Sequence, residues 1–397
     1  MSRKERRKEP ALTPKERVEL SQKNIPLRIV LTVLALVLAG VCFANALDSS
    51  TAIPAGWQEI APANPQTYAA QDFVLSYNLG AGQKSPKAEL QALAPLYTKA
   101  LDAAYQSLAN EPVEGVSNLY TLNTQPNTEV RVNELLYDAL GQLEASGSRR
   151  MYYAPMADQY LALFACTYDE EAEQFDPARN PAAAAFAAEI AAFAQDAASV
   201  RLVLLPEQTV RLEVSEKYLT YARENGVESF VDFGVLRNAL LCDAVADALA
   251  AQGYENGVVS SLDGYTRNLC SQEFALNIFD LQEGKAKNLG AVVYTGPAAL
   301  VSFRAFPLGQ DEAVNYFTYS DGTVVPPYLA ENALSHTAAS NLSTISKEGT
   351  VTALALKTLS AFTGDDAAFP ALAGISWASA QGGQIRISGG DFTRFHQ

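Results

Sequence analysis

The feature that most constrains this chain is an uncharged stretch from Ile29 to Leu47. It contains nineteen residues, of which only Thr32 and Asn45 are clearly polar. A helix that crosses the hydrocarbon core of a membrane needs roughly 20 apolar residues, because each residue advances the helix by about 1.5 Å. The stretch therefore predicts one transmembrane helix over 29–47.

The charges on the two sides of this span predict its orientation. Residues 1–29 hold nine Lys and Arg and four Glu, a net charge of +5, whereas the whole chain carries −15, so residues 30–397 carry −20. Lys and Arg favour the cytoplasmic side of a membrane. We expect a cytoplasmic tail over 1–28, the transmembrane helix over 29–47, a tether over 48–66 and an extracytoplasmic domain over 67–397. The protein would then be a single-pass protein of the cell membrane. Its acidic body repels nucleic-acid phosphates, so we expect no nucleic-acid partner.

Two other interpretations of the N-terminal segment stay open. The tripeptide Ala44-Asn45-Ala46 fits a signal-peptidase site, after which the span would be removed. Cys42 suggests a lipid-attachment site, although the preceding Val41 is larger than the small residue expected there.

Hydrophobic periodicity downstream of the span predicts helices and strands in no strict βαβ alternation. This mixture favours an α+β fold, with mixed or antiparallel sheets and packed helices. We expect helices over 87–108, 133–144, 181–198, 215–225, 236–252 and 350–362. We expect strands over 71–79, 129–132, 200–206, 209–214, 228–233, 257–261, from 291 to 318, and over 384–388.

Four blocks of sequence carry a resemblance to a known family. They are Ser117–Asn123 (Ser-Asn-Leu-Tyr-Thr-Leu-Asn), Met151–Pro155 (Met-Tyr-Tyr-Ala-Pro), Val231–Asp243 (Val-Asp-Phe-Gly-Val-Leu-Arg-Asn-Ala-Leu-Leu-Cys-Asp) and Val351–Ala361. The third block is the most specific and leads through a helix and a strand to Asp263-Gly264. In these blocks, and in the order of elements from about Phe73 to Phe362, the chain resembles the ApbE family of FAD:protein FMN transferases.

The resemblance implies an ApbE-like fold outside the bacterial cytoplasmic membrane. Members of the family use Mg²⁺ to split FAD and join FMN to a Thr or Ser hydroxyl of a partner protein. The implied cofactors are thus FAD or FMN with Mg²⁺, and the implied partners are a flavin or nucleotide, an extracytoplasmic protein and the membrane. The implied cofactor-binding residues are Ser117, Asn123, Asp232, Gly234, Asn238, Asp243, Asp263 and Gly264. The implied metal ligands are Thr358 and Asp321.

The chain departs from the family's pattern where the chemistry needs particular residue types. Leu354 stands where the family has a metal-binding Asp, Asn238 where it has Lys, and Val235 where it has a second Gly. The segment 315–322 lacks the family's His. Mg²⁺ requires hard oxygen ligands, and cleavage of a pyrophosphate requires its developing charge to be neutralised.

Three functional hypotheses follow. The domain is a catalytically degraded transferase homologue that acts in binding or scaffolding, an active transferase with a rearranged metal site, or an envelope protein of unrelated function. Each site residue also has a purely structural alternative: helix-end carboxylates for Asp232 and Asp243, a turn at Asp263-Gly264, caps at Ser117 and Asn123, and an ordinary buried Thr358.

Overall fold

The computed structural model describes residues 37–39, 53–82, 84–366 and 369–395. The chain divides into two compact units, 1–53 and 54–397, and the second contains all the strands of the described residues. The predicted membrane span lies outside the described residues except for Val37–Ala39, which are helical. Within the described ranges, no helix has the length and apolarity required to cross a membrane.

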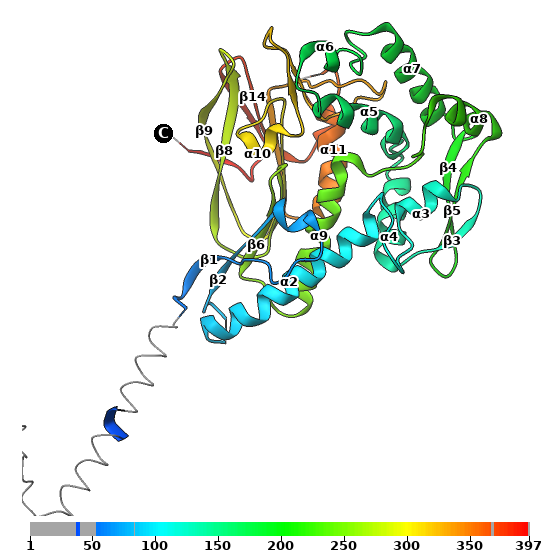
Figure 1. Ribbon diagram of the computed structural model, residues 1–397. Helices are drawn as coiled ribbons and strands as arrows, with labels where there is room; N and C mark the ends of the chain where they lie inside the picture. The colour runs from blue at the N-terminus through cyan, green and yellow to red at the C-terminus, as the bar shows by residue number, and fades with distance from the viewer. Residues whose placement is uncertain (1–36, 40–52, 83, 367–368, 396–397) are drawn as a thin grey trace, which may run out of the picture. The chain divides into compact units, whose positions relative to one another are not determined.

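The second unit is built on an eight-stranded sheet in the order β1-β2-β6-β7-β10-β13-β14-β15 (Figure 1). Every pairing in it is antiparallel. The strands are β1 (Gly56–Glu59), β2 (Phe73–Leu79), β6 (Gly257–Ser261), β7 (Tyr265–Asn268), β10 (Ala298–Arg304), β13 (Asn341–Ser346), β14 (Ser376–Gln381) and β15 (Gln384–Ser388). The prediction of an α+β fold with antiparallel sheet is therefore confirmed.

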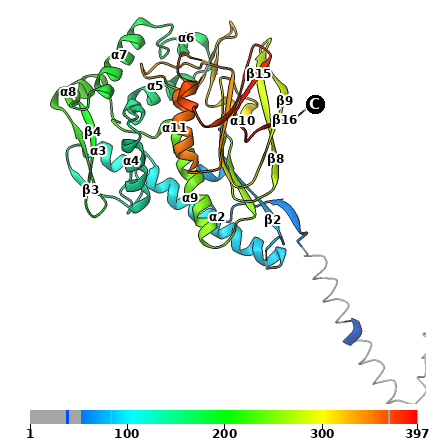
Figure 2. The same cartoon turned by 180° about the vertical axis from the view of Figure 1, so that it is seen from behind.

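The two faces of this sheet are covered differently (Figures 1 and 2). Helices α9 (Arg237–Ala251) and α11 (Val351–Phe362) pack on one face, and α2 (Pro86–Leu108) packs against α9. The long hairpin β8 (Glu273–Gln282) and β9 (Lys285–Thr295) covers the other face, with β16 (Thr393–Phe395) paired to β9. An apolar cluster joins hairpin and sheet and includes Ile278, Val292, Leu300, Ile345 and Ala378. The sheet is thus the middle layer of three.

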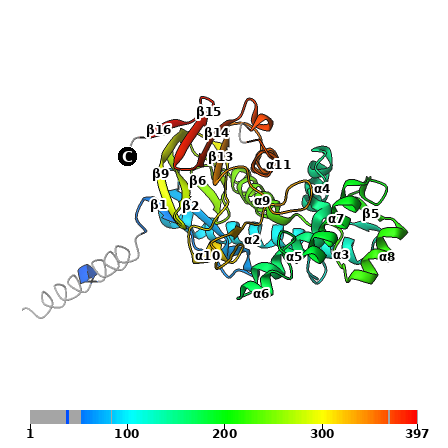
Figure 3. The ribbon, with the colours of Figure 1, turned by 90° about the horizontal axis from the view of Figure 1, so that it is seen from above.

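A second lobe of mostly helices lies beside this sandwich (Figure 3). It surrounds the three-stranded sheet β3-β5-β4. Its elements are α3 (Leu119–Thr124), β3 (Glu129–Arg131), α4 (Glu134–Ala145), η2 (Arg150–Tyr153), α5 (Ala154–Phe164), α6 (Asp169–Ala172), α7 (Pro181–Gln195), β4 (Val200–Leu205), β5 (Thr209–Val214) and α8 (Glu216–Asn225). The short elements are η1 (Tyr68–Gln71), η3 (Gly234–Leu236), α10 (Gln310–Ala313), β11 (Phe317–Thr318), β12 (Val324–Val325) and η4 (Pro370–Leu372).

Helix ends follow the local chemistry expected from the sequence. The Ser215 side chain accepts a hydrogen bond from the Tyr218 N–H at the start of α8, and Gly226 ends this helix in the left-handed conformation. Ser85 and Thr350 cap α2 and α11 in the same way. These boundaries were predicted to within one or two residues because capping is encoded locally.

Two expectations require correction. Residues 54–66 do not all form a tether, because β1 pairs with β2 and Ile60 is buried. The strand expected over 228–233 is absent, and that segment is an irregular loop. The backbone N–H groups of this segment do not pair with a strand. Those of Phe230 and Val231 donate to the Asn123 side chain, and that of Asp232 donates to the Met151 carbonyl. A side chain distant in sequence thus takes the place of a neighbouring strand.

Candidate functional site

A cavity of about 440 Å³ opens between the helical lobe and the sheet sandwich. Its walls come from η2 and α5 on one side, from η3 and the start of α9 on another, and from the turn between β6 and β7 and the segment around α10. This volume lies within the range of roughly 300–1,000 Å³ that is usual for small-molecule and cofactor sites. Four of the residues implicated by the sequence line it: Asp232, Gly234, Asn238 and Asp263.

Asp232 and Gly234 form a tight turn that leads into η3. The Gly234 N–H donates to Asp232 Oδ1 over 2.6 Å, and Gly234 adopts a φ of 53°, which glycine tolerates more readily than other residues. Burial raises the pKa of Asp232, while the Gly234 N–H and the charge of Arg237 oppose that rise. The turn therefore holds a carboxyl group of reduced acidity at the cavity wall.

Asn238 and Asp263 both line the cavity and are joined by a hydrogen bond. Asn238 Nδ2 donates to Asp263 Oδ2 over 3.1 Å, whereas Asp263 Oδ1 is buried without a hydrogen-bond partner. Burial raises the pKa of Asp263 to about 6, and the nearby charge of Asp72 adds to the rise. A buried acceptor without a partner costs stability, so this oxygen suits a ligand that donates a hydrogen bond.

Arg237 provides the complementary group. Its Nε is buried without a hydrogen-bond partner, and its guanidinium lies 5.4 Å from the centre of the Tyr105 ring. Its charge lowers the pKa values of both Asp72 and Asp232 against the effect of their burial. Arg304, which also lines the cavity, has a buried Nε without a partner as well, so the lining contains two unsatisfied donors and one unsatisfied acceptor.

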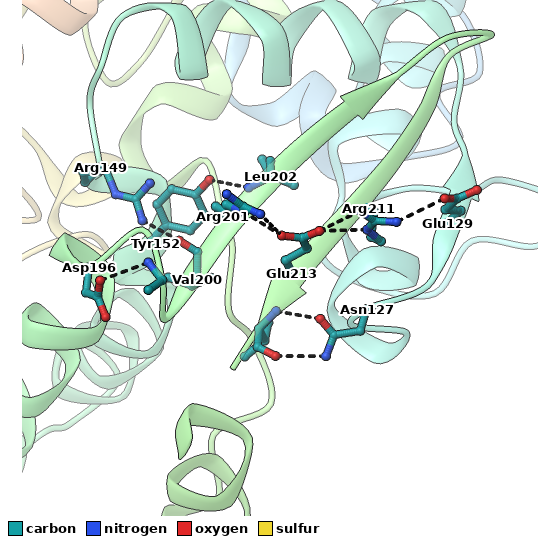
Figure 4. A network of polar contacts seen from close by, with 12 residues as sticks. Asn127, Glu129, Arg149, Tyr152, Asp196, Val200, Arg201, Leu202, Arg211 and Glu213 are labelled. Atoms are coloured by element: carbon teal, nitrogen blue, oxygen red, sulfur yellow. Dashed lines mark hydrogen bonds and ion pairs between the residues drawn. The ribbon is translucent and has the colours of Figure 1, made fainter. Parts of the chain in front are cut away.

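The wall formed by η2 is held rigidly by the helical lobe (Figure 4). The Arg149 guanidinium lies 4.1 Å from the centre of the Tyr152 ring and donates to the carbonyls of Ala194 and Val200. The Tyr152 hydroxyl accepts from the Leu202 N–H over 2.8 Å and donates to Glu144. These contacts fix the adjacent Arg150 and Tyr153, both of which line the cavity.

Sequence reasoning missed most of the acidic lining. Asp158 lies in α5, directly after the Met151–Pro155 block, and its pKa is raised to about 6 by burial and by the charges of Asp232 and Glu228. Its place about one turn into the helix that begins within the block, at Ala154, was the only available signal. The carboxyl residues that line the cavity are Asp72, Glu111, Asp158, Asp232, Asp263, Asp311 and Glu312.

Three of the implicated residues lie outside the lining and have structural surroundings. Ser117 is half-buried, and the neighbouring Asn118 rather than Ser117 caps α3. Asn123 is buried. Its side chain forms hydrogen bonds with the Phe230 N–H and with the N–H and carbonyl of Val231, in the loop before Asp232. Gly264 has a φ of 100° in the β6–β7 turn, where a Cβ would stand 2.0 Å from the Ser302 carbonyl oxygen.

The other three also lie outside the cavity lining. Asp243 accepts hydrogen bonds from the Val351 N–H and from the N–H and hydroxyl of Thr352, each over 2.8 Å, and so caps α11. Thr358 is fully buried, and its hydroxyl donates to the Leu354 carbonyl. Asp321 forms a 2.6 Å ion pair with Arg179, and hydrogen bonds from Arg179 and Thr323 lower its pKa to about 2.

These surroundings do not fit a Mg²⁺ site. The hydroxyl oxygen of Thr358 lies 2.7 Å from the hydroxyl oxygen of Thr344. The Thr358 hydroxyl therefore has two protein partners, Thr344 and the Leu354 carbonyl. Leu354, four residues earlier on α11, is buried and apolar. Across the ranges that the structure describes, no group of three or more His, Cys, Asp or Glu side chains is arranged to hold a metal ion. The implied ligands Thr358 and Asp321 are not brought together with the cavity residues.

Comparison with known proteins supports the fold. No protein-family model matches the chain, and no curated protein sequence does. Among solved structures, the chain is similar to the flavin transferase ApbE from Vibrio cholerae, with a TM-score of 0.53 and 12% sequence identity over 86% of this chain and 97% of that one. A point mutant of the same enzyme gives a TM-score of 0.51 at 12% identity, over 85% and 97% of the two chains. The ApbE-like fold expected from the sequence is thereby confirmed.

Proposed function

We propose that this protein binds a flavin or a related nucleotide in its cavity and does not transfer FMN. One observation carries the proposal. The cavity retains Asp232, Gly234, Asn238 and Asp263 at its wall, whereas the positions implied for the metal are occupied by the apolar Leu354 and by the internally bonded Thr358. The fold and the binding cavity are kept while the donor set for a metal is missing.

The loss of the metal ligands bears directly on the chemistry. A cleaving pyrophosphate develops negative charge, and its stabilisation by a metal or a cation is worth several kcal/mol in the transition state. Asn238 supplies a dipole without a positive charge, and its amide is already bonded to Asp263. Without the metal and the cation, the same cavity is suited to binding or scaffolding.

The test is to titrate the full-length protein with FAD and FMN, with and without Mg²⁺, and then to add an acceptor peptide. We expect flavin binding that chelation of Mg²⁺ does not change, and no covalently attached fluorescence. Arg237→Gln should weaken binding, whereas Asp321→Asn, which alters an ion pair outside the cavity, should not. Covalent labelling that depends on Mg²⁺ would instead support an active transferase, and the absence of any flavin binding would favour an unrelated envelope function.

We also propose that residues 48–397 face the outside of the cell membrane, held by the span over 29–47, where they meet a partner protein. The excess of Lys and Arg over residues 1–29 supports this orientation. Protease added to intact protoplasts should digest the domain. Full protection of the domain would show that the orientation is reversed.

A further inference from the structure

We propose that the cavity selects a flavin without phosphate groups, such as riboflavin, over FMN and FAD. This inference rests on the proposed function, since it concerns the ligand of the same cavity. The recognised part would be a heteroaromatic ring whose edge carries both a hydrogen-bond donor and an acceptor.

The charge of the lining argues against phosphate. Seven carboxyl residues and three arginines line the cavity, and the lining contains no Lys or His. A phosphate group entering this space brings further negative charge close to the carboxylates, and the repulsion opposes its binding. The three arginines would have to neutralise the phosphate as well as the surrounding carboxylates.

Two of the three arginines form polar contacts with protein groups. Arg304 forms a 2.8 Å ion pair with Glu312, and both side chains are largely buried. Arg150 donates to the Leu329 carbonyl and, over 2.9 Å, to the Thr363 hydroxyl. A phosphate would have to compete with these partners for the two guanidinium groups, although the buried Nε of Arg304 has no hydrogen-bond partner.

Arg237 lines the cavity together with Asp72 and Asp232, and its charge lowers the pKa values of both carboxyl groups. Its buried Nε lacks a hydrogen-bond partner. A neutral carbonyl oxygen satisfies one N–H donor without adding charge, whereas a phosphate would compete with the flanking carboxylates. This environment suits a carbonyl group.

The remaining lining suits a planar ring. Eight aromatic residues contribute to it, among them Tyr105, Tyr153, Tyr160 and Tyr316. Aromatic rings favour stacked or edge-to-face contact with another ring. Asp263 Oδ1 can accept from a ring N–H, and Arg237 Nε can donate to a ring carbonyl. The isoalloxazine ring of riboflavin carries both groups on one edge.

The experiment compares the dissociation constants of riboflavin, FMN and FAD for the full-length protein, measured by flavin fluorescence in the presence of a chelator. At about pH 8 we expect riboflavin to bind at least about tenfold more tightly than FMN. Equal or tighter binding of FMN or FAD would overturn this inference and leave the proposed function intact. If none of the three binds, the proposed function fails and the inference fails with it.

A charge variant tests the cause of the preference. Asp158→Asn removes one carboxylate from the cavity wall, so the preference for riboflavin over FMN should fall about threefold or more. The matched control is Asp247→Asn, which removes the same charge from the exposed side of α9, outside the cavity lining, and should leave the ratio unchanged. If both variants change the ratio equally, overall charge rather than the cavity determines it. If neither variant changes it, carboxylate repulsion is not the cause. Either result contradicts the inference.

Discussion

Replacing Asn123 with Ala should strongly destabilise the protein. The Asn123 side chain donates to Asn110 Oδ1 and to the Val231 carbonyl, both over 2.8 Å. Its Oδ1 accepts from the N–H groups of Phe230 and Val231, over 2.9 and 3.0 Å. One side chain therefore satisfies four polar groups of two segments that are distant in sequence.

The magnitude follows from the groups that the substitution leaves without partners. A buried donor or acceptor without a partner costs about 1–3 kcal/mol, and relaxation or water recovers part of that cost. We therefore expect Asn123→Ala to lower the free energy of unfolding by about 3–5 kcal/mol, because the two N–H groups that it abandons are buried. For a folded unit of this size that corresponds to a fall in Tm of roughly 4–7 °C.

The assay is thermal unfolding followed by circular dichroism, with Ser117→Ala as the matched control. Ser117 belongs to the same sequence block and is half-buried, so its substitution should change the stability by no more than about 0.5 kcal/mol. The reasoning fails if the Tm values of the two variants agree within about 1 °C. In that case the loop that carries Asp232 would be held by other contacts.

Three further predictions concern Asp243, Asp263 and the metal. Asp243→Ala should lower the free energy of unfolding, measured in urea, by about 2–4 kcal/mol, because three donors at the start of α11 lose their acceptor. A loss below about 0.5 kcal/mol would contradict the capping role of Asp243. Asp263 has a folded-state pKa of about 6 against an ordinary value of 3.8, so stability should fall as pH rises between these values. Asp263→Asn should remove the contribution of Asp263 to that fall and, at about pH 7.5, be more stable than the parent by about 1–2 kcal/mol; identical pH profiles would refute it. Adding Mg²⁺ to about 10 mM should leave the parent's Tm unchanged within about 1 °C in a thermal scan, since Thr358 has only protein partners, and a larger rise would reveal a metal site.

Local signals in the sequence predicted much of the fold. The alternating apolar residues of 73–79, the cap at Ser215 and the Gly at 226 each act within a few residues, and the corresponding elements are present. The expected strand over 228–233 failed because its partner is a side chain from α3, about a hundred residues earlier. Periodicity carries no information about such a distant bond.

The candidate site was predictable only in part, for the same reason. Asp232, Gly234, Asn238 and Asp263 line one cavity, although 25 residues separate Asn238 from Asp263. Asp158 was missed because its part in the cavity depends on how α5 packs against the loop at Asp232. A motif identifies candidate residues, whereas only the packing of the two lobes shows which of them meet.

The differences from the transferase pattern in α11 share one structural explanation. Leu354 is buried, Thr358 bonds to Thr344 and to its own helix, and the N-terminus of the helix is capped by Asp243. Each of these groups contributes to packing or to helix capping, so the helix is stabilised as part of the core. A carboxylate at 354 would be buried without a partner unless a metal accompanied it, and burying an unpaired charge is costly. Apolar packing at this position is therefore a stable alternative to metal binding rather than a partial metal site.

The cavity is separate from these contacts, since only Leu359 of α11 belongs to its lining. The ligand binding proposed for the cavity therefore does not depend on the groups that stabilise α11.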